Sequence, residues 1–244
     1  MKIRSVLTAL VATSTVVLAS SLPASSADTD VLLIPDDVVA SDTRSGGHYE
    51  VEDDGGLHIW TDGNTSNDKV ALYFDGGAAA LGSVGEPSLS VTTISGTIPP
   101  GFQLGVDFDG VAGDTNGGVD GILVGEPTYY GTTWWLSNGS EQFVKDGAPN
   151  TGGGYGSPWF GTLAEWSDAF PAATVATFGF SLGSGVLGDH VIDSMSYAGT
   201  TYTFGEAVRL GSKEDCKNGG WATSTDPVFK NQGECVSSFV RQDG

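Results

Sequence analysis

Hydrophobic residues along the chain gather in short segments that are rich in β-branched and aromatic side chains. Clusters of Gly, Asn, Asp, Ser or Pro separate these segments, which is typical of strands joined by turns. Residues 177–182 alternate between small or polar side chains and large apolar ones, as expected for a strand with one face on a core. The pattern predicts strands at residues 57–61, 69–74, 89–94, 102–108, 119–124, 132–136, 175–182, 191–197 and 200–204.

Many short strands with turn signals between them predict an antiparallel β-sandwich of jelly-roll or immunoglobulin-like type. One short helix is expected beside the sheets. Thr162 and Glu165 have the spacing of a capping box. Leu163 and Trp166 share one face of the predicted helix, and Pro171 ends it. We therefore expect Trp166 to lie in the core.

The tetrapeptide Val-Gly-Glu-Pro occurs twice, at residues 84–87 and 124–127. No longer similarity surrounds the two copies, so they give little support to an internal duplication. We interpret them as two similar strand ends.

Composition agrees with an all-β fold. Charged residues make up 16% of the chain and hydrophobic residues 39%, and there are 37 glycines, which excludes a helical bundle or coiled coil. The formal net charge is −20, which repels nucleic acid and anionic lipid surfaces. We therefore expect no nucleic-acid partner.

Residues 1–27 have the layout of a secretory signal peptide. Lys2 and Arg4 precede an apolar run, and small residues end the segment at Ala27. A membrane anchor is the alternative, but the run is short, contains Thr and Ser, and lacks basic residues after it. We expect cleavage, secretion to the extracellular space and no membrane span.

Cys216 and Cys235 are the two cysteines of the chain, and a pair in an exported protein predicts a disulfide. A metal or redox pair fits their spacing less well. Residues 28–206 hold 25 acidic and 3 basic residues, whereas residues 207–244 hold five of each. The change in charge predicts an acidic sandwich domain over 28–206 and a small disulfide-containing segment over 207–244.

One loop between predicted strands concentrates oxygen-bearing side chains among glycines. Side-chain oxygens of this kind suit calcium, which takes six to eight oxygen ligands. The spacing is not that of an EF-hand. A solvated hairpin loop is the alternative, because turns use the same residue types. The predicted calcium ligands are Asp107, Asp109, Asp114, Asn116 and Asp120.

Aromatic residues supply the candidate binding surface. Trp134 and Trp135 are adjacent in a predicted strand, so only one of them can enter the core. Tyr155 and Trp159 lie in a glycine-rich segment. Aromatic rings beside amides and carboxylates are typical of sugar-binding surfaces. We predict that these four residues bind an extracellular glycan or cell-envelope polymer; the alternative is that they form a second core layer.

The sequence indicates no catalytic site. Residues 179–183 match the letters of G-x-S-x-G, but glycines follow Ser181 where a nucleophile elbow needs a helix. With 30 acidic residues, no pair of carboxylates stands out as a glycosidase pair. We therefore expect a non-catalytic binding module and name no catalytic residue. The alternatives are a secreted polysaccharide hydrolase and a structural or protein-binding surface protein.

Two parts of the chain carry a resemblance to known groups of proteins. Residues 107–125, 134–136, 142–147 and 178–185 resemble uncharacterised exported proteins of high-GC Gram-positive bacteria. The tail pattern Cys-Lys-x-Gly-Gly-Trp followed by Asn-Gln-Gly-x-Cys-Val resembles a short C-terminal segment of many secreted bacterial proteins. The resemblance implies export and a modular chain, and it implies no reaction or ligand.

Overall fold

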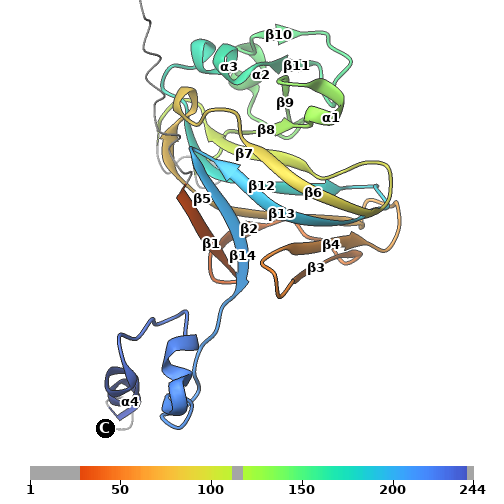
Figure 1. The fold of residues 1–244 in the computed structure, drawn as a ribbon. Helices are drawn as coiled ribbons and strands as arrows, with labels where there is room; N and C mark the ends of the chain where they lie inside the picture. The colour runs from red at the N-terminus through yellow and green to blue at the C-terminus, as the bar shows by residue number, and fades with distance from the viewer. Residues whose placement is uncertain (1–27, 112–117, 241–244) are drawn as a thin grey trace, which may run out of the picture.

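The computed structural model describes residues 28–111 and 118–240, and it consists mainly of two β-sheets packed face to face (Figure 1). The predicted β-sandwich is therefore confirmed. The predicted signal peptide, residues 1–27, lies outside the described residues, as do Asp114 and Asn116. Within the described residues, no helix is long and apolar enough to cross a membrane.

The smaller sheet has six strands. Its order is β1-β14-β13-β4-β3, and β6 pairs with the other edge of β13. The pair of β1 and β14 is parallel, and the remaining pairs of this sheet are antiparallel. The strands are β1 (Asp28–Ile34), β3 (Gly47–Val51), β4 (Leu57–Thr61), β6 (Ser88–Ser95), β13 (Asp189–Tyr197) and β14 (Thr200–Glu206).

The larger sheet has eight strands in the order β10-β11-β9-β8-β7-β12-β5-β2, all antiparallel. It extends beyond the edge of the smaller sheet. The edge strand β6 of the smaller sheet packs against β7, and β8 and β9 continue the larger sheet past that contact. The strands are β2 (Val38–Ser41), β5 (Lys69–Ala80), β7 (Gly101–Asp107), β8 (Gly121–Gly125), β9 (Trp134–Leu136), β10 (Asn150–Thr151), β11 (Trp159–Gly161) and β12 (Thr174–Gly183).

The core lies between the sheets and follows the predicted alternation. Phe178, Phe180 and Leu182 of β12 are buried, with Phe178 stacked on Tyr197 of β13 at 4.3 Å between ring centroids. Tyr197 also donates its hydroxyl to the carbonyl of Gly76 at 2.9 Å. The alternating residues of β12 therefore hold the two sheets together.

The predicted helix is α3 (Leu163–Ala169), and both halves of its capping box are present. Trp166 on this helix is fully buried, as expected. Three further short helical segments were not predicted: η1 (Leu81–Ser83), α1 (Pro127–Tyr130) and α2 (Gln142–Asp146). In Figure 1, α1, α2 and α3 gather around β9, β10 and β11 at one end of the sandwich.

The C-terminal segment contains η3 (Lys217–Thr223) and α4 (Gln232–Val240). The predicted disulfide between Cys216 and Cys235 is present, with a Cα–Cα distance of 5.8 Å. Together with Phe229 these cysteines form a small buried cluster that is separate from the core of the sandwich. An ion pair at 2.8 Å between Arg209 and Asp36 connects the segment to the sandwich.

Five strands were not predicted from the sequence: β1, β2, β3, β10 and β11. The residues of β2 and β3 are partly buried or exposed, and none is fully buried. These two strands therefore lack the apolar alternation that marks a strand with one face in the core. Each of the five unpredicted strands has two to seven residues and lies at or near the end of a sheet.

Candidate ligand-binding groove

A groove of about 680 Å³ opens where the smaller sheet ends at β6. One wall is β6, and the other consists of the end of β8, the helix α1 and the start of β9. We call it the edge groove. Its main lining residues are Glu86, Leu89, Val91, Thr93, Phe102, Glu126, Tyr129 and Trp134.

The edge of β6 that borders this groove is a strand edge without a partner. In the part of the chain that the structure describes, β6 pairs with β13 alone. Its other edge therefore presents backbone N–H and C=O groups that a ligand can use. The strand has 8 residues, a length of roughly 26 Å, which suits an extended ligand.

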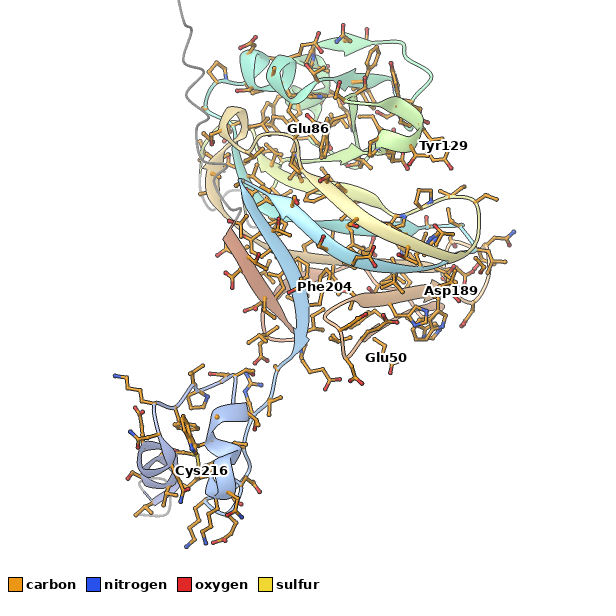
Figure 2. All side chains as sticks on the ribbon, in the orientation of Figure 1. Glu50, Glu86, Tyr129, Asp189, Phe204 and Cys216 are labelled. Atoms are coloured by element: carbon orange, nitrogen blue, oxygen red, sulfur yellow. A yellow bond between two sulfur atoms is a disulfide. The ribbon has the colours of Figure 1, made fainter. Side chains whose placement is uncertain are left out.

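The two copies of Val-Gly-Glu-Pro meet at the edge groove. Glu86 of the first copy accepts a hydrogen bond from the indole Nε1 of Trp134 at 2.9 Å. Glu126 of the second copy accepts one from Nε1 of Trp135, also at 2.9 Å. Each indole thus fixes one carboxylate oxygen. Both glutamates are among the residues at the groove, but the carboxylate of Glu126 lies with Trp135 on the other face of the sheet. Figure 2 shows Glu86 on the segment that leads into β6.

Trp134 forms part of the floor of the groove and is only 2% exposed. Its ring lies against Gly125 of β8, where an added Cβ would come within 2.8 Å of the ring carbons. Phe102 of β7 contacts it edge to face, at 6.1 Å between ring centroids. The absence of a side chain at Gly125 therefore lets Trp134 lie flat on the sheet.

Tyr129 stands at the mouth of the groove and is 50% exposed (Figure 2). Its hydroxyl donates to the carbonyl oxygen of Thr97 at 3.0 Å. Thr97 lies in the connection between β6 and β7, so this bond joins the two walls of the groove. The tyrosine therefore combines an accessible ring with a fixed position.

The four aromatic residues predicted to bind a ligand do not form one surface. Trp134 is buried, and Trp159 packs against the main core with the ammonium of Lys145 at 5.3 Å from its ring. Trp135 and Tyr155 are partly exposed and lie on the other side of the sheet. Of the four, Trp134 alone lines the edge groove.

Trp135 and Tyr155 belong to an aromatic cluster under the glycine-rich loop. Tyr155 contacts Phe160 at 4.4 Å and Tyr130 at 4.9 Å between ring centroids. Gly156 covers Trp135 so closely that an added Cβ would lie 2.5 Å from its ring. The loop thus packs on these rings and leaves them only partly accessible.

Three of the predicted calcium ligands lie together, and we call them the acidic cluster. Asp107, Asp109 and Asp120 each offer a ligand oxygen within 4.8 Å of the others. Backbone N–H groups position the carboxylates: Phe108 donates to Asp120 at 2.7 Å and Gly110 to Asp107 at 2.6 Å. Asp107 and Asp120 are buried, whereas Asp109 is exposed. Oxygens of this kind at this spacing suit a hard cation.

A second hollow, of about 610 Å³, lies on the outer face of the larger sheet. Gly105, Thr177 and Ile122 line it, together with Asp120 of the acidic cluster. Tyr73 at its border is hydrogen-bonded to Gln103, and burial raises the pKa of its hydroxyl to about 12. This hollow has no exposed aromatic ring and no carboxylate fixed by an indole, whereas the edge groove has Tyr129 and Glu86, so we regard the edge groove as the better candidate site.

Ser181 lies within β12, is buried and donates to the carbonyl of Gly183 at 3.1 Å. The described residues after it form a bend and then β13, so the strand-to-helix turn of a nucleophile elbow is not present there. The match to G-x-S-x-G is therefore part of an ordinary alternating strand.

Sequence reasoning missed Glu86, Glu126 and Tyr129 as members of a site. The signal that could have identified the glutamates was the repeated tetrapeptide, since the first copy leads into β6 and the second into α1, both beside the groove. No comparison adds to this picture: no protein-family model, no curated protein and no solved structure matches the chain. The resemblance to exported bacterial proteins stays a prediction.

Proposed function

We propose that this protein is a non-catalytic binding module that holds an extracellular glycan or cell-envelope polymer in the edge groove. The observation that supports this most is the position of Glu86, whose carboxylate is fixed by the indole of Trp134 beside an apolar floor. An aromatic ring covers the apolar face of a sugar, and carboxylates accept bonds from its hydroxyls. Tyr129 supplies the accessible ring.

The proposed location is extracellular. The Cys216–Cys235 disulfide supports an oxidising compartment, and the predicted signal peptide is consistent with it. Polymers of cell walls and extracellular matrices are then the ligands that such a groove meets.

Sedimentation tests the proposal. The mature chain, residues 28–244, is mixed with insoluble polysaccharides and isolated cell walls, and the pelleted fraction is measured. We expect pelleting with at least one polymer, and we expect Tyr129→Ala to reduce it. Tyr49→Ala is the control, because Tyr49 is also an exposed tyrosine, 37% accessible, but lies on β3. Equal pelleting of wild type and Tyr129→Ala would contradict the assignment of the groove.

A hydrolase is the second candidate function, because Glu86 places a carboxylate beside the groove. Measuring released sugar in the supernatant of the same experiment distinguishes the two functions. Release by wild type that is lost in Glu86→Gln would favour hydrolysis over binding alone.

We further propose that calcium stabilises the acidic cluster. The three described carboxylates lie within 4.8 Å, and their mutual repulsion falls when a divalent cation binds them. We expect calcium to raise the melting temperature above that in a chelator, and Asp107→Asn to remove most of the difference. Asp193→Asn on the exposed face of β13 is the control. An identical melting temperature with calcium and chelator would contradict the proposal.

A further inference from the structure

A further hollow, of about 380 Å³, adjoins the edge groove. We call it the side hollow. It lies where η1 and the segment that leads into β6 meet the first turn of α3, and Gly82, Gly85 and Ala164 are among its lining residues. Glu86 and Thr132 line both the side hollow and the edge groove. The two hollows therefore meet at these two residues.

Small residues keep the side hollow open. Gly85 has a φ of +71°, and a Cβ added to it would meet nothing within 4 Å. Gly82 passes so close to α3 that an added Cβ would lie 2.6 Å from Oγ of Ser167. Ala164, in the first turn of α3, is exposed and has only a methyl group. A larger side chain at Ala164 would therefore occupy part of the hollow.

Glu86 stands at the point where the two hollows meet, and it is exposed. Its Oε1 accepts the indole N–H of Trp134 at 2.9 Å, which holds the carboxylate in place before a ligand arrives. A carboxylate has about four acceptor positions on its two oxygens, so acceptor capacity remains for a ligand. Sugar hydroxyls in either hollow can therefore donate to this one carboxylate.

We infer that one polysaccharide chain occupies the edge groove and the side hollow together, so that the protein binds several consecutive sugar units and not a single sugar. This inference rests on the proposed function, and it names the form of glycan that the site takes. The two hollows together exceed about 1,000 Å³, the upper end of the usual range for small-molecule sites. Once the first units lie in the edge groove, the next units reach the side hollow at a high effective concentration.

The experiment compares a disaccharide with a hexasaccharide of the polymer that pellets the protein, by calorimetric titration of the mature chain. Cello-oligosaccharides are used if cellulose pellets the protein, and chito-oligosaccharides if chitin does. We expect the hexasaccharide to bind about tenfold more tightly, because a disaccharide in the edge groove leaves the side hollow empty.

Ala164→Trp fills the side hollow from α3. We expect it to lower the affinity for the hexasaccharide about tenfold, to that of the disaccharide, and to leave the disaccharide unaffected. Ala169→Trp is the matched control, because Ala169 is also exposed on α3 but lines neither hollow. Tyr129→Ala, in contrast, should weaken binding of both sugars, since Tyr129 belongs to the edge groove.

Equal affinity of wild type for the two sugars would overturn the inference. A tighter hexasaccharide that Ala164→Trp leaves unaffected would overturn it too, because the chain would then extend in another direction, such as along β6. In either case, weaker binding by Tyr129→Ala would leave the proposed glycan function standing. Binding of neither sugar, combined with no pelleting on any polymer, would remove the proposed function as well.

Discussion

The indole N–H of Trp134 donates to Oε1 of Glu86 at 2.9 Å and so connects β9 to the segment that enters β6. The next residue, Trp135, faces the other side of β9, where its indole N–H donates to Oε2 of Glu126 at 2.9 Å. Two adjacent tryptophans thus hold the glutamates of two identical tetrapeptides. Because of this arrangement, a packing feature of β9 also fixes the carboxylate of Glu86 beside the edge groove.

The two tryptophans are expected to differ in their contribution to stability. Trp134→Phe removes buried ring volume and the bond to Glu86, and we expect a loss of about 2 kcal/mol in the free energy of unfolding. Trp135→Phe, at a partly exposed position, should cost under about 1 kcal/mol. Urea denaturation measures both. A larger loss for Trp135→Phe would show that the aromatic cluster under the loop dominates this region.

The capping box of α3 gives a second prediction. The Thr162 hydroxyl accepts a bond from the backbone N–H of Glu165 at 3.2 Å, so Thr162→Ala should destabilise the protein by about 1 kcal/mol. Thr162→Ser keeps the hydroxyl and serves as the control. An equal loss for the two variants would mean that the methyl group, and not the cap, stabilises the helix.

The same box predicts a dependence on acid. The backbone N–H of Thr162 donates to Glu165 and holds the pKa of that carboxyl below its ordinary value of 4.5. The ionised form is therefore favoured in the folded state, and its contribution to stability is lost as the pH falls from 4.5 through the lower folded pKa. Glu165→Gln should be less stable than wild type at neutral pH, and the difference should shrink in acid. A constant difference would contradict this.

His190 predicts a second loss of stability in acid, because the folded state favours the neutral form of its ring. It is fully buried, and desolvation lowers the pKa of its imidazole below 6.5. Because the folded state favours the neutral ring, the free energy of unfolding should fall as the pH drops below 6.5. Unfolding by urea at about pH 7.5 and about pH 5.5 should show this loss in wild type and a smaller one in His190→Gln. Equal pH dependence in both proteins would refute the assignment.

The disulfide should stabilise the C-terminal segment alone. The buried cluster of Cys216, Phe229 and Cys235 shares no residue with the core of the sandwich. Replacing both cysteines by serine removes about 3 kcal/mol of loop constraint from this segment. We expect rapid proteolysis after residue 206 and an unchanged melting temperature of the sandwich. A lower melting temperature of the sandwich would show that the two parts unfold together.

Local patterns predicted most of the sandwich. The alternation around Phe178 placed β12, and the spacing of Thr162 and Glu165 placed α3, because each signal lies within a few neighbouring residues. The strands β2 and β3 carried no such signal, since their side chains are mostly exposed. The strands β1 and β14 come from the two ends of the sandwich domain's sequence, and they pair in parallel. No local pattern encodes a pairing between residues so far apart in the chain.

The candidate site was harder to predict for the same reason. Glu86, Tyr129 and Trp134 line one groove only because β6, β8 and β9 come together in the fold. Conversely, Tyr155 and Trp159 were chosen because glycines surround them. Those glycines let the loop pack closely on the rings of Tyr155 and Trp135, and Trp159 packs against the core. Glycine-rich sequence indicated close approach here, and it did not indicate an open binding surface.

The indole resonances in a proton–nitrogen correlation spectrum test the central claim most directly. Trp134 lines the edge groove, while Trp221 lies in the C-terminal segment and provides an internal control. On titration with a soluble oligosaccharide from the polymer that pellets the protein, we predict shifts of the Trp134 indole and of the backbone amides of β6 and α1, with Trp221 unchanged. Shifts confined to the Trp135 indole and to the backbone amides of Tyr155 and its loop would contradict the account and place the ligand on the opposite side of the sheet.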